Sequence, residues 1–370
     1  MLVNLPHSAQ FWLPGYCRDR FVRATQSKRI RRVWLAVADH FEPYWDRADD
    51  CTARARVNSW LLHWPTIANR SAKDSVSASP IYTFFYPQEE YRSDILDSLA
   101  ELCHAGISDV EVHIHHDGEG REDFIKRISI FIEILHSRHG LLRKQNGKIR
   151  FGFIHGNWAL DNSIPGGRWC GLNDEISILR DLGCYADFTM AAGAHPSQAS
   201  VMNRIYWCAD DPNKPKSYDR GVDLSVGGEI HGDLLMIPGP FGVRWRERLA
   251  PRLETGELAH NNLPTPYRVK RWFDLSPGVG GDLFVKLYTH GSQERNSSVL
   301  LNGALEQLYS LVAEEATRRG CEYYWVSTWE MYSVVEAIRC GKHPVSTLAG
   351  IRAGTVSNAN SGHLARTGKL

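Results

Sequence analysis

Apolar and polar positions alternate in short stretches along the chain, and this period predicts a series of strands. In the clearest of them, residues 109–115, the polar positions are Glu111, His113 and His115. Alternate residues of a strand share a face, so one face is apolar and the other carries a carboxylate and two imidazoles. Further strands are predicted at residues 33–40, 81–86, 150–155, 187–190, 233–238, 283–288 and 322–327.

Apolar residues three and four positions apart predict helices between most of these strands. The clearest helices lie at residues 95–102, 124–135, 176–182 and 301–312. Strands that alternate with helices favour a parallel sheet, and seven or eight such units favour a closed β/α barrel. Residues 193–232 have little periodicity, so we expect them to form long loops over one mouth of the barrel.

The pattern predicts one domain, because no repeat and no clear linker divides the chain. Residues 1–29 are aromatic and interrupted by proline, and we expect an irregular N-terminal arm. The barrel should then occupy residues 30–345. We expect residues 346–370 to form a disordered tail, because from Gly354 onward the chain is rich in Gly, Ser, Asn and Thr.

Composition narrows the function classes. A net charge of +1 gives no field that would attract nucleic acid or an anionic membrane. No run approaches the ~20 apolar residues of a membrane span, and the first thirty residues lack a signal-peptide core. The eight cysteines are scattered without C-x-x-C spacing, which indicates reduced thiols in a cytoplasmic protein. The sequence gives no indication of oligomeric state.

Candidate chemistry gathers where predicted strands end. The residues concerned are Asp39, His40, His115, His116, His155 and His290. A β/α barrel carries its active site at the C-terminal ends of its strands. Imidazole and carboxylate are ligands of zinc and similar ions, so these positions predict a divalent metal, zinc by preference. The alternative is a set of hydrogen-bonded core histidines beside polar loops.

In this order the strand ends resemble motifs of the polysaccharide deacetylase superfamily (carbohydrate esterase family 4, NodB-like). Residues 37–40 (VADH) stand in place of its acidic pair, with His40 as the second member. His113, His115 and His116 stand in place of a histidine pair. Residues 151–158 (FGFIHGNW) resemble a loop that shapes the substrate site, without the usual arginine and proline. Residues 286–290 (KLYTH) resemble the last motif, which ends in a catalytic histidine.

The resemblance implies a distorted (β/α)7 barrel that holds a divalent metal and removes acetyl groups from sugars. By this comparison Asp39 is the candidate general base and His290 the general acid. The candidate metal ligands are His40, His113, His115 and His116. Such a site lowers the pKa of bound water and protonates the leaving amine.

The loop after residue 155 supplies candidates for substrate binding. His155 suits a metal ligand, a substrate donor or a core histidine. Trp158 can stack on the apolar face of a sugar, or simply anchor its loop. Asn157 and Arg168 suit sugar hydroxyls.

The expected function is therefore a metal-dependent carbohydrate deacetylase, a hydrolase of C–N bonds acting on an N-acetylated sugar or another small amide. Three alternatives remain. The H-x-H spacing of His113 and His115 also occurs in amidohydrolase barrels, although on their first strand. A glycosidase would need two facing carboxylates. A carbohydrate-binding barrel without turnover would retain the fold alone.

Overall fold

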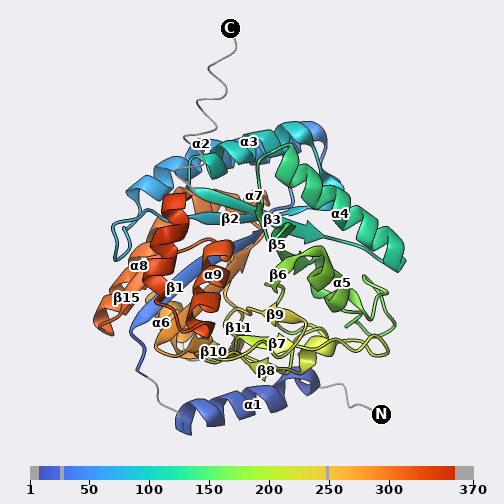
Figure 1. Cartoon of the computed structure of the whole chain (residues 1–370). Coiled ribbons are helices and arrows are strands. Elements are labelled where there is room, and N and C mark those ends of the chain that lie inside the picture. Colours follow the sequence, from blue (N-terminus) through green and yellow to red (C-terminus); the bar gives the residue numbers. More distant parts are fainter. Residues whose placement is uncertain (1–7, 26–28, 247–249, 355–370) are drawn as a thin grey trace.

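The structure is a computed structural model that describes residues 8–25, 29–246 and 250–354. One large sheet organises it, with the strand order β12-β14-β1-β2-β3-β5-β6-β9-β7-β8 (Figure 1). The strands that carry the site are β1 (Arg32–His40), β2 (Tyr82–Pro87), β3 (Ser108–Ile114), β5 (Lys148–His155), β6 (Cys184–Asp187), β9 (Leu234–Met236) and β14 (Asp282–Thr289).

Shorter strands extend the sheet at its edges. These are β4 (Arg143–Gln145), β7 (Tyr206–Cys208), β8 (Val222–Asp223), β12 (Glu257–Leu258), β13 (Gly278–Val279) and β15 (Glu322–Trp325). A separate hairpin pairs β10 (Gly242–Arg246) with β11 (Ala250–Glu254).

The central strands pair in parallel from β14 through β1, β2, β3, β5 and β6 to β9. The predicted α/β class with a mostly parallel sheet is therefore confirmed. Within the described residues no ladder joins β12 to β8 at the two ends of the sheet, so closure of the barrel stays a prediction.

Helices cover the sheet and account for the apolar runs of its strands. They are α2 (Asp50–Arg70), α3 (Ser93–His104), α4 (Arg121–Ser137), α5 (Glu175–Leu182), α6 (Pro266–Leu275), α7 (Glu294–Val299), α8 (Leu305–Arg318) and α9 (Thr328–Arg339). In Figure 1, α2, α3 and α4 lie along the upper edge, whereas α9 lies in front of the sheet. Within the described residues, no helix has both the length and the apolar composition that crossing a bilayer requires.

Strand β1 is buried on both faces. Leu35 and Val37 pack in the larger core with Trp60 of α2, whereas Ala36 packs in a second core with Val334 of α9. A strand covered on both sides reads as a continuous apolar run. Its alternation also places neighbouring residues at its tip on opposite faces.

Several boundaries differ from the sequence prediction. The strand expected at residues 187–190 lies at Cys184–Asp187, where it pairs with β5. The helix expected from residue 301 begins as a π-helical segment, Leu300–Ala304, before α8.

The irregular N-terminal arm is a wrong prediction for Ala9–Thr25, which form helix α1. Partners distant in sequence hold this helix. Trp12 packs edge-on against Phe241 at 5.4 Å, and Asp19 accepts a hydrogen bond from Asn203. Local periodicity could not indicate such contacts.

The disordered tail is likewise a wrong prediction for residues 346–354, which belong to a helical stretch from 344 to 354. Leu348 is buried in the second core, and Arg352 pairs with Glu330 at 2.8 Å. The rest of the expected tail, residues 355–370, lies outside the described residues, as do residues 1–7 and 26–28 of the expected arm.

Candidate metal and active site

The C-terminal ends of β1, β3 and β14 bring five side chains together, which we call the mouth group. Its members are His40, Glu42, His113, His115 and His290. Potential ligand atoms of His40, Glu42 and His290 lie within 4.8 Å of one another. The same holds for Glu42, His113 and His115, so that Glu42 is common to both sets.

Hydrogen bonds at Nδ1 fix the orientation of two imidazoles in the mouth group, those of His113 and His115. Nδ1 of His113 lies 2.8 Å from the carbonyl oxygen of Ile154, which can only accept a hydrogen bond. Nδ1 of His115 lies 2.5 Å from Oε1 of Glu89. Both Nδ1 atoms therefore carry hydrogen, and a lone pair is available at Nε2 of each ring once that atom gives up its proton. Burial lowers the pKa of His115, but the hydrogen bond with Glu89 and the charges of the neighbouring carboxylates together outweigh burial and raise it.

These lone pairs point at a third acceptor. Oε1 of Glu42 lies 3.1 Å from Nε2 of His113 and 3.5 Å from Nε2 of His115. Burial favours the neutral acid, but the hydrogen bond with His113 and the surrounding imidazoles lower the pKa of Glu42 to about 2. An ionised carboxylate facing two lone pairs requires a cation between them, either a proton or a metal ion.

His40 and His290 also lie near Glu42, with ring centres 4.8 Å apart. His40 is buried, and burial lowers its pKa well below the ordinary value. Burial also lowers the pKa of His290, which is half-buried. Both rings lie 6.1 Å from Trp158, whose buried indole nitrogen has no hydrogen-bond partner among the described atoms.

Asp39 lies on the opposite face of β1 from His40. Its Oδ1 accepts a hydrogen bond from the Gly291 amide at 2.6 Å, and its Oδ2 accepts one from the Tyr82 hydroxyl at 2.9 Å. The side chain is 0 % exposed, and burial raises its pKa to about 7. A Cβ at Gly291 would lie 2.2 Å from Oδ2, so only glycine allows this contact. Asp39 thus holds the loop that carries His290, outside the mouth group.

A second cluster, which we call the loop group, contains His116, His155, Cys170 and Glu175, all of them buried. His116 follows β3, His155 ends β5, Cys170 lies in the following loop and Glu175 begins α5. Of the predicted metal ligands, the structure therefore places His40, His113 and His115 in the mouth group and His116 elsewhere.

The two groups touch at Gly156. A Cβ at this position would lie 2.2 Å from Cδ2 of His115 in the mouth group. The carbonyl oxygen of Gly156 accepts a hydrogen bond from Nδ1 of His155 in the loop group at 2.6 Å. The backbone of one glycine therefore separates the two sets of ligands.

The remaining predicted substrate residues lie along the loop after β5. Asn157 and Trp158 adopt left-handed backbone angles, with φ of 53° and 54°. The Arg168 guanidinium lies 3.5 Å from the ring centre of Trp169, which stacks on His195. These aromatic contacts extend from His195 to Trp158, whose ring centres are 6.0 Å apart.

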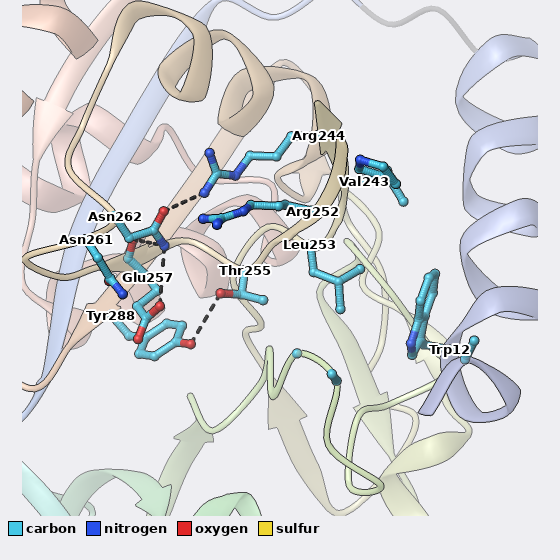
Figure 2. Close-up of a pocket in the computed structure, with 14 residues that line it drawn as sticks. Trp12, Val243, Arg244, Arg252, Leu253, Thr255, Glu257, Asn261, Asn262 and Tyr288 are labelled. Carbon is cyan, nitrogen blue, oxygen red and sulfur yellow. Dashed lines mark hydrogen bonds between the residues drawn. The ribbon is translucent and has the colours of Figure 1, made fainter. Parts of the chain in front are cut away.

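A cavity of about 630 Å³ lies beyond Tyr288 from the mouth group, and no member of that group lines it. Tyr288, one of its lining residues, lies with its ring centre 5.7 Å from that of His40. Figure 2 shows Arg244, Asn262 and Glu257 linked on one wall, with Trp12 of α1 across the cavity. The cavity is of a size that accepts a small ligand, and its wall is both aromatic and polar.

Sequence reasoning missed three members of these groups, Glu42, Cys170 and Glu175, and also Glu89, which orients His115. Glu42 had a usable signal, because it follows His40 by two residues as an acid at the same strand tip. Cys170 and Glu175 had none, since a long loop and a new helix bring them to His155.

Comparisons with known proteins give only distant likenesses. No family model matches the sequence, and no curated protein matches it. Among solved structures, one similar chain is a protein from Parabacteroides distasonis assigned as a glycoside hydrolase/deacetylase. It has 9 % identity and a TM-score of 0.43, over 84 % of this chain and 71 % of that one. Another is the 4-alpha-glucanotransferase of Thermococcus litoralis, with 13 % identity and a TM-score of 0.39, over 82 % of this chain and 43 % of that one.

Proposed function

We propose that the protein is a metal-dependent hydrolase that removes an acyl group from an N-acylated sugar or a related small amide at the mouth group. One observation carries this proposal, the convergence of Nε2 of His113 and Nε2 of His115 on Oε1 of Glu42, at 3.1 and 3.5 Å. Two histidines and one glutamate form a ligand set that zinc uses in hydrolases and that leaves a position open for water.

The donors present fit a zinc ion. Glu42, His113 and His115 would hold it, and Ile154 and Glu89 orient the two imidazoles. Such hydrogen bonds behind a ligand fix its tautomer and strengthen metal binding. When bound, zinc lowers the pKa of water and polarises the acyl carbonyl.

His290 is the proposed proton carrier. Its lowered pKa leaves the imidazole neutral at rest, so it can accept a proton from the attacking water. The same ring then donates that proton to the leaving amine nitrogen as the C–N bond breaks. The products are a carboxylic acid and a free amine, with no net gain or loss of protons on His290.

We assign Asp39 a positioning role in place of the base role that the resemblance implies. Its two carboxylate oxygens accept hydrogen bonds from Gly291 and Tyr82. This arrangement fixes the residue next to His290. Water at the mouth group would approach the other face of β1.

The substrate class follows from the surfaces around the mouth group. Trp158 offers an aromatic ring and an indole N–H without a partner in the described structure. Aromatic faces stack on sugars, and an indole N–H binds a hydroxyl. The cavity beside Tyr288 adds Glu257, Asn261 and Asn262 as polar groups for further hydroxyls.

The test is release of acetate and free amine from a panel of N-acetylated oligosaccharides by the zinc-loaded protein. We expect turnover in the wild type and none in His113→Ala, with Ser333→Ala of α9 as a matched control. Bond cleavage between sugars without acetate release would favour the glycosidase alternative. Glycan binding without any product would favour the barrel that lacks turnover.

A further inference from the structure

The loop group has the composition and spacing of a closed metal site. Nε2 of His116 lies 2.9 Å from Nε2 of His155 and 3.2 Å from Oε1 of Glu175. The third pair, His155 and Glu175, is 3.4 Å apart. Ligands at ~2.0 Å from zinc in a tetrahedron lie roughly 3.3 Å from one another, so these separations leave room for one such ion.

Two of the ligands, His155 and Glu175, are oriented by a hydrogen bond on the side away from the group. Nδ1 of His155 donates to the Gly156 carbonyl, which leaves the Nε2 lone pair pointing into the group. Oε2 of Glu175 accepts a hydrogen bond from the Asp161 amide at 2.7 Å, so Oε1 remains for the group.

Cys170 completes the set with sulfur. The amides of Asn162 and Leu172 donate to its Sγ at 3.2 and 3.5 Å. Burial and the neighbouring carboxylate of Glu175 raise the pKa of this thiol well above its usual range, against the two amide hydrogen bonds. A metal ion would therefore bind here by displacing the thiol proton, since cysteine binds metals as the thiolate. Its Sγ lies within 4.8 Å of the other ligand atoms.

A network of hydrogen bonds alone does not satisfy a neutral His116. If its Nε2 carried the proton shared with His155, its Nδ1 would be a bare acceptor. That buried Nδ1 has no hydrogen-bond partner among the described atoms and lies 3.9 Å from the carboxylate of Glu119. A cation bound at Nε2 moves the hydrogen to Nδ1, where it faces this carboxylate favourably.

We propose that the loop group binds a structural zinc ion, distinct from the metal of the mouth group. Two imidazoles, one thiolate and one carboxylate supply four ligands, and all four side chains are buried. A site with four protein ligands and no access for water holds structure and performs no hydrolysis. A zinc ion with thiolate in its ligand set is typical of such sites.

The position of the proposed ion in the fold indicates that it would hold one long loop in place. It would join the ends of β3 and β5 to the loop of residues 156–174 and to the start of α5. That loop contains several non-glycine residues with left-handed backbone angles, Asn157, Trp158, Asp161, Asn162 and Trp169. Such conformations persist only where surrounding contacts impose them. The loop also places Trp158 beside the mouth group.

Cobalt substitution tests the proposal, because a cobalt–thiolate bond gives an intense near-ultraviolet charge-transfer band and the mouth group has no cysteine. We expect this band in the wild type and in the control Cys184→Ser, whose thiol is buried but donates to the Ala186 carbonyl. Cys170→Ser should lose the band and one equivalent of zinc. The wild-type spectrum decides the question even if that variant fails to fold.

Failure of this inference can be told apart from failure of the proposed function. Glu42→Gln should lose mouth-group metal but keep the thiolate band and one equivalent of zinc. A wild type without the band, or a Cys170→Ser protein with unchanged zinc content, would overturn the structural site whatever the outcome for acetate release.

Discussion

The mouth group and the loop group use nearly the same residue types in contrasting surroundings. In the mouth group His290 is half-buried, and Tyr288 next to His40 lines a cavity. In the loop group all four side chains are buried, and one of them is a cysteine. The contrast shows that ligand type alone does not assign a role. Access for a substrate and the presence of sulfur separate a candidate reaction centre from a candidate structural site.

The strongest test of this contrast exchanges a glutamate for glutamine in each group. We expect Glu42→Gln to reduce turnover to background while the protein stays folded. Glu175→Gln should instead lower the free energy of unfolding by roughly 3 kcal/mol. The reason is that loss of the buried carboxylate charge leaves its partners in the loop group unpaired. Acetate release and urea unfolding measure the two effects. Equal loss of stability in both variants would erase the distinction.

The next largest effect concerns two histidines that differ in their exposure to solvent, His290 and His155. His290→Ala should lower kcat by roughly 10²- to 10⁴-fold at unchanged zinc content, as expected for a lost proton carrier. His155→Ala should lower zinc content and thermal stability together. Zinc analysis beside steady-state kinetics gives both quantities. Loss of zinc in His290→Ala would make His290 a ligand.

A smaller effect comes from the carboxylates behind the histidines. Glu89 is hydrogen-bonded to His115 at 2.5 Å, whereas Glu119 lies 3.9 Å from His116 without a hydrogen bond. Glu89→Gln should weaken zinc binding at the mouth group by roughly 10- to 100-fold. Glu119→Gln should have a smaller effect on the loop group. Competition with a chromophoric chelator measures both affinities.

The last prediction concerns the scaffold, apart from either group, and is smallest when it is counted per pH unit. Burial lowers the pKa of Lys286 to about 7, against the opposing influence of Asp187, and its Nζ donates to the Phe188 carbonyl. Between pH 7 and the ordinary lysine pKa the unfolded chain binds more protons than the folded protein. Stability should therefore rise with pH across this window, by up to about 1.4 kcal/mol per pH unit.

Lys286→Met should flatten this rise, which urea unfolding at pH 7 and pH 9 measures. The slope should be the same with and without zinc, because neither group contains Lys286. A slope that depends on zinc would mean that the measurement reports occupancy of the sites.

Strand positions could be predicted from the sequence because alternation is a local signal. The face that joins His113 to His115 on β3 was read correctly, since Val110, Val112 and Ile114 occupy the other face in the larger core. The same rule, applied to β1, separates Asp39 from His40. The resemblance placed both in the site, whereas strand geometry allows only one of them on the inner face.

What the sequence did not reveal depends on contacts distant along the chain. Glu89 follows β2 and is hydrogen-bonded to His115, which follows β3. Cys170 lies close to His155 only because the loop after β5 folds back. Helix α1 depends on Asn203 and Phe241. No window of neighbouring residues contains these pairings, because they exist only once the sheet brings the strand ends together.

Gly156 limits which substitutions either group can accept, because it contacts both of them. With His115 against its Cα and His155 bonded to its carbonyl, the position tolerates no side chain without displacing the imidazole next to it. Neither group could be remodelled by mutation here while the other kept its shape. A change in substrate preference at the mouth group would therefore have to be made through the outer loops and the cavity wall, with Gly156 kept.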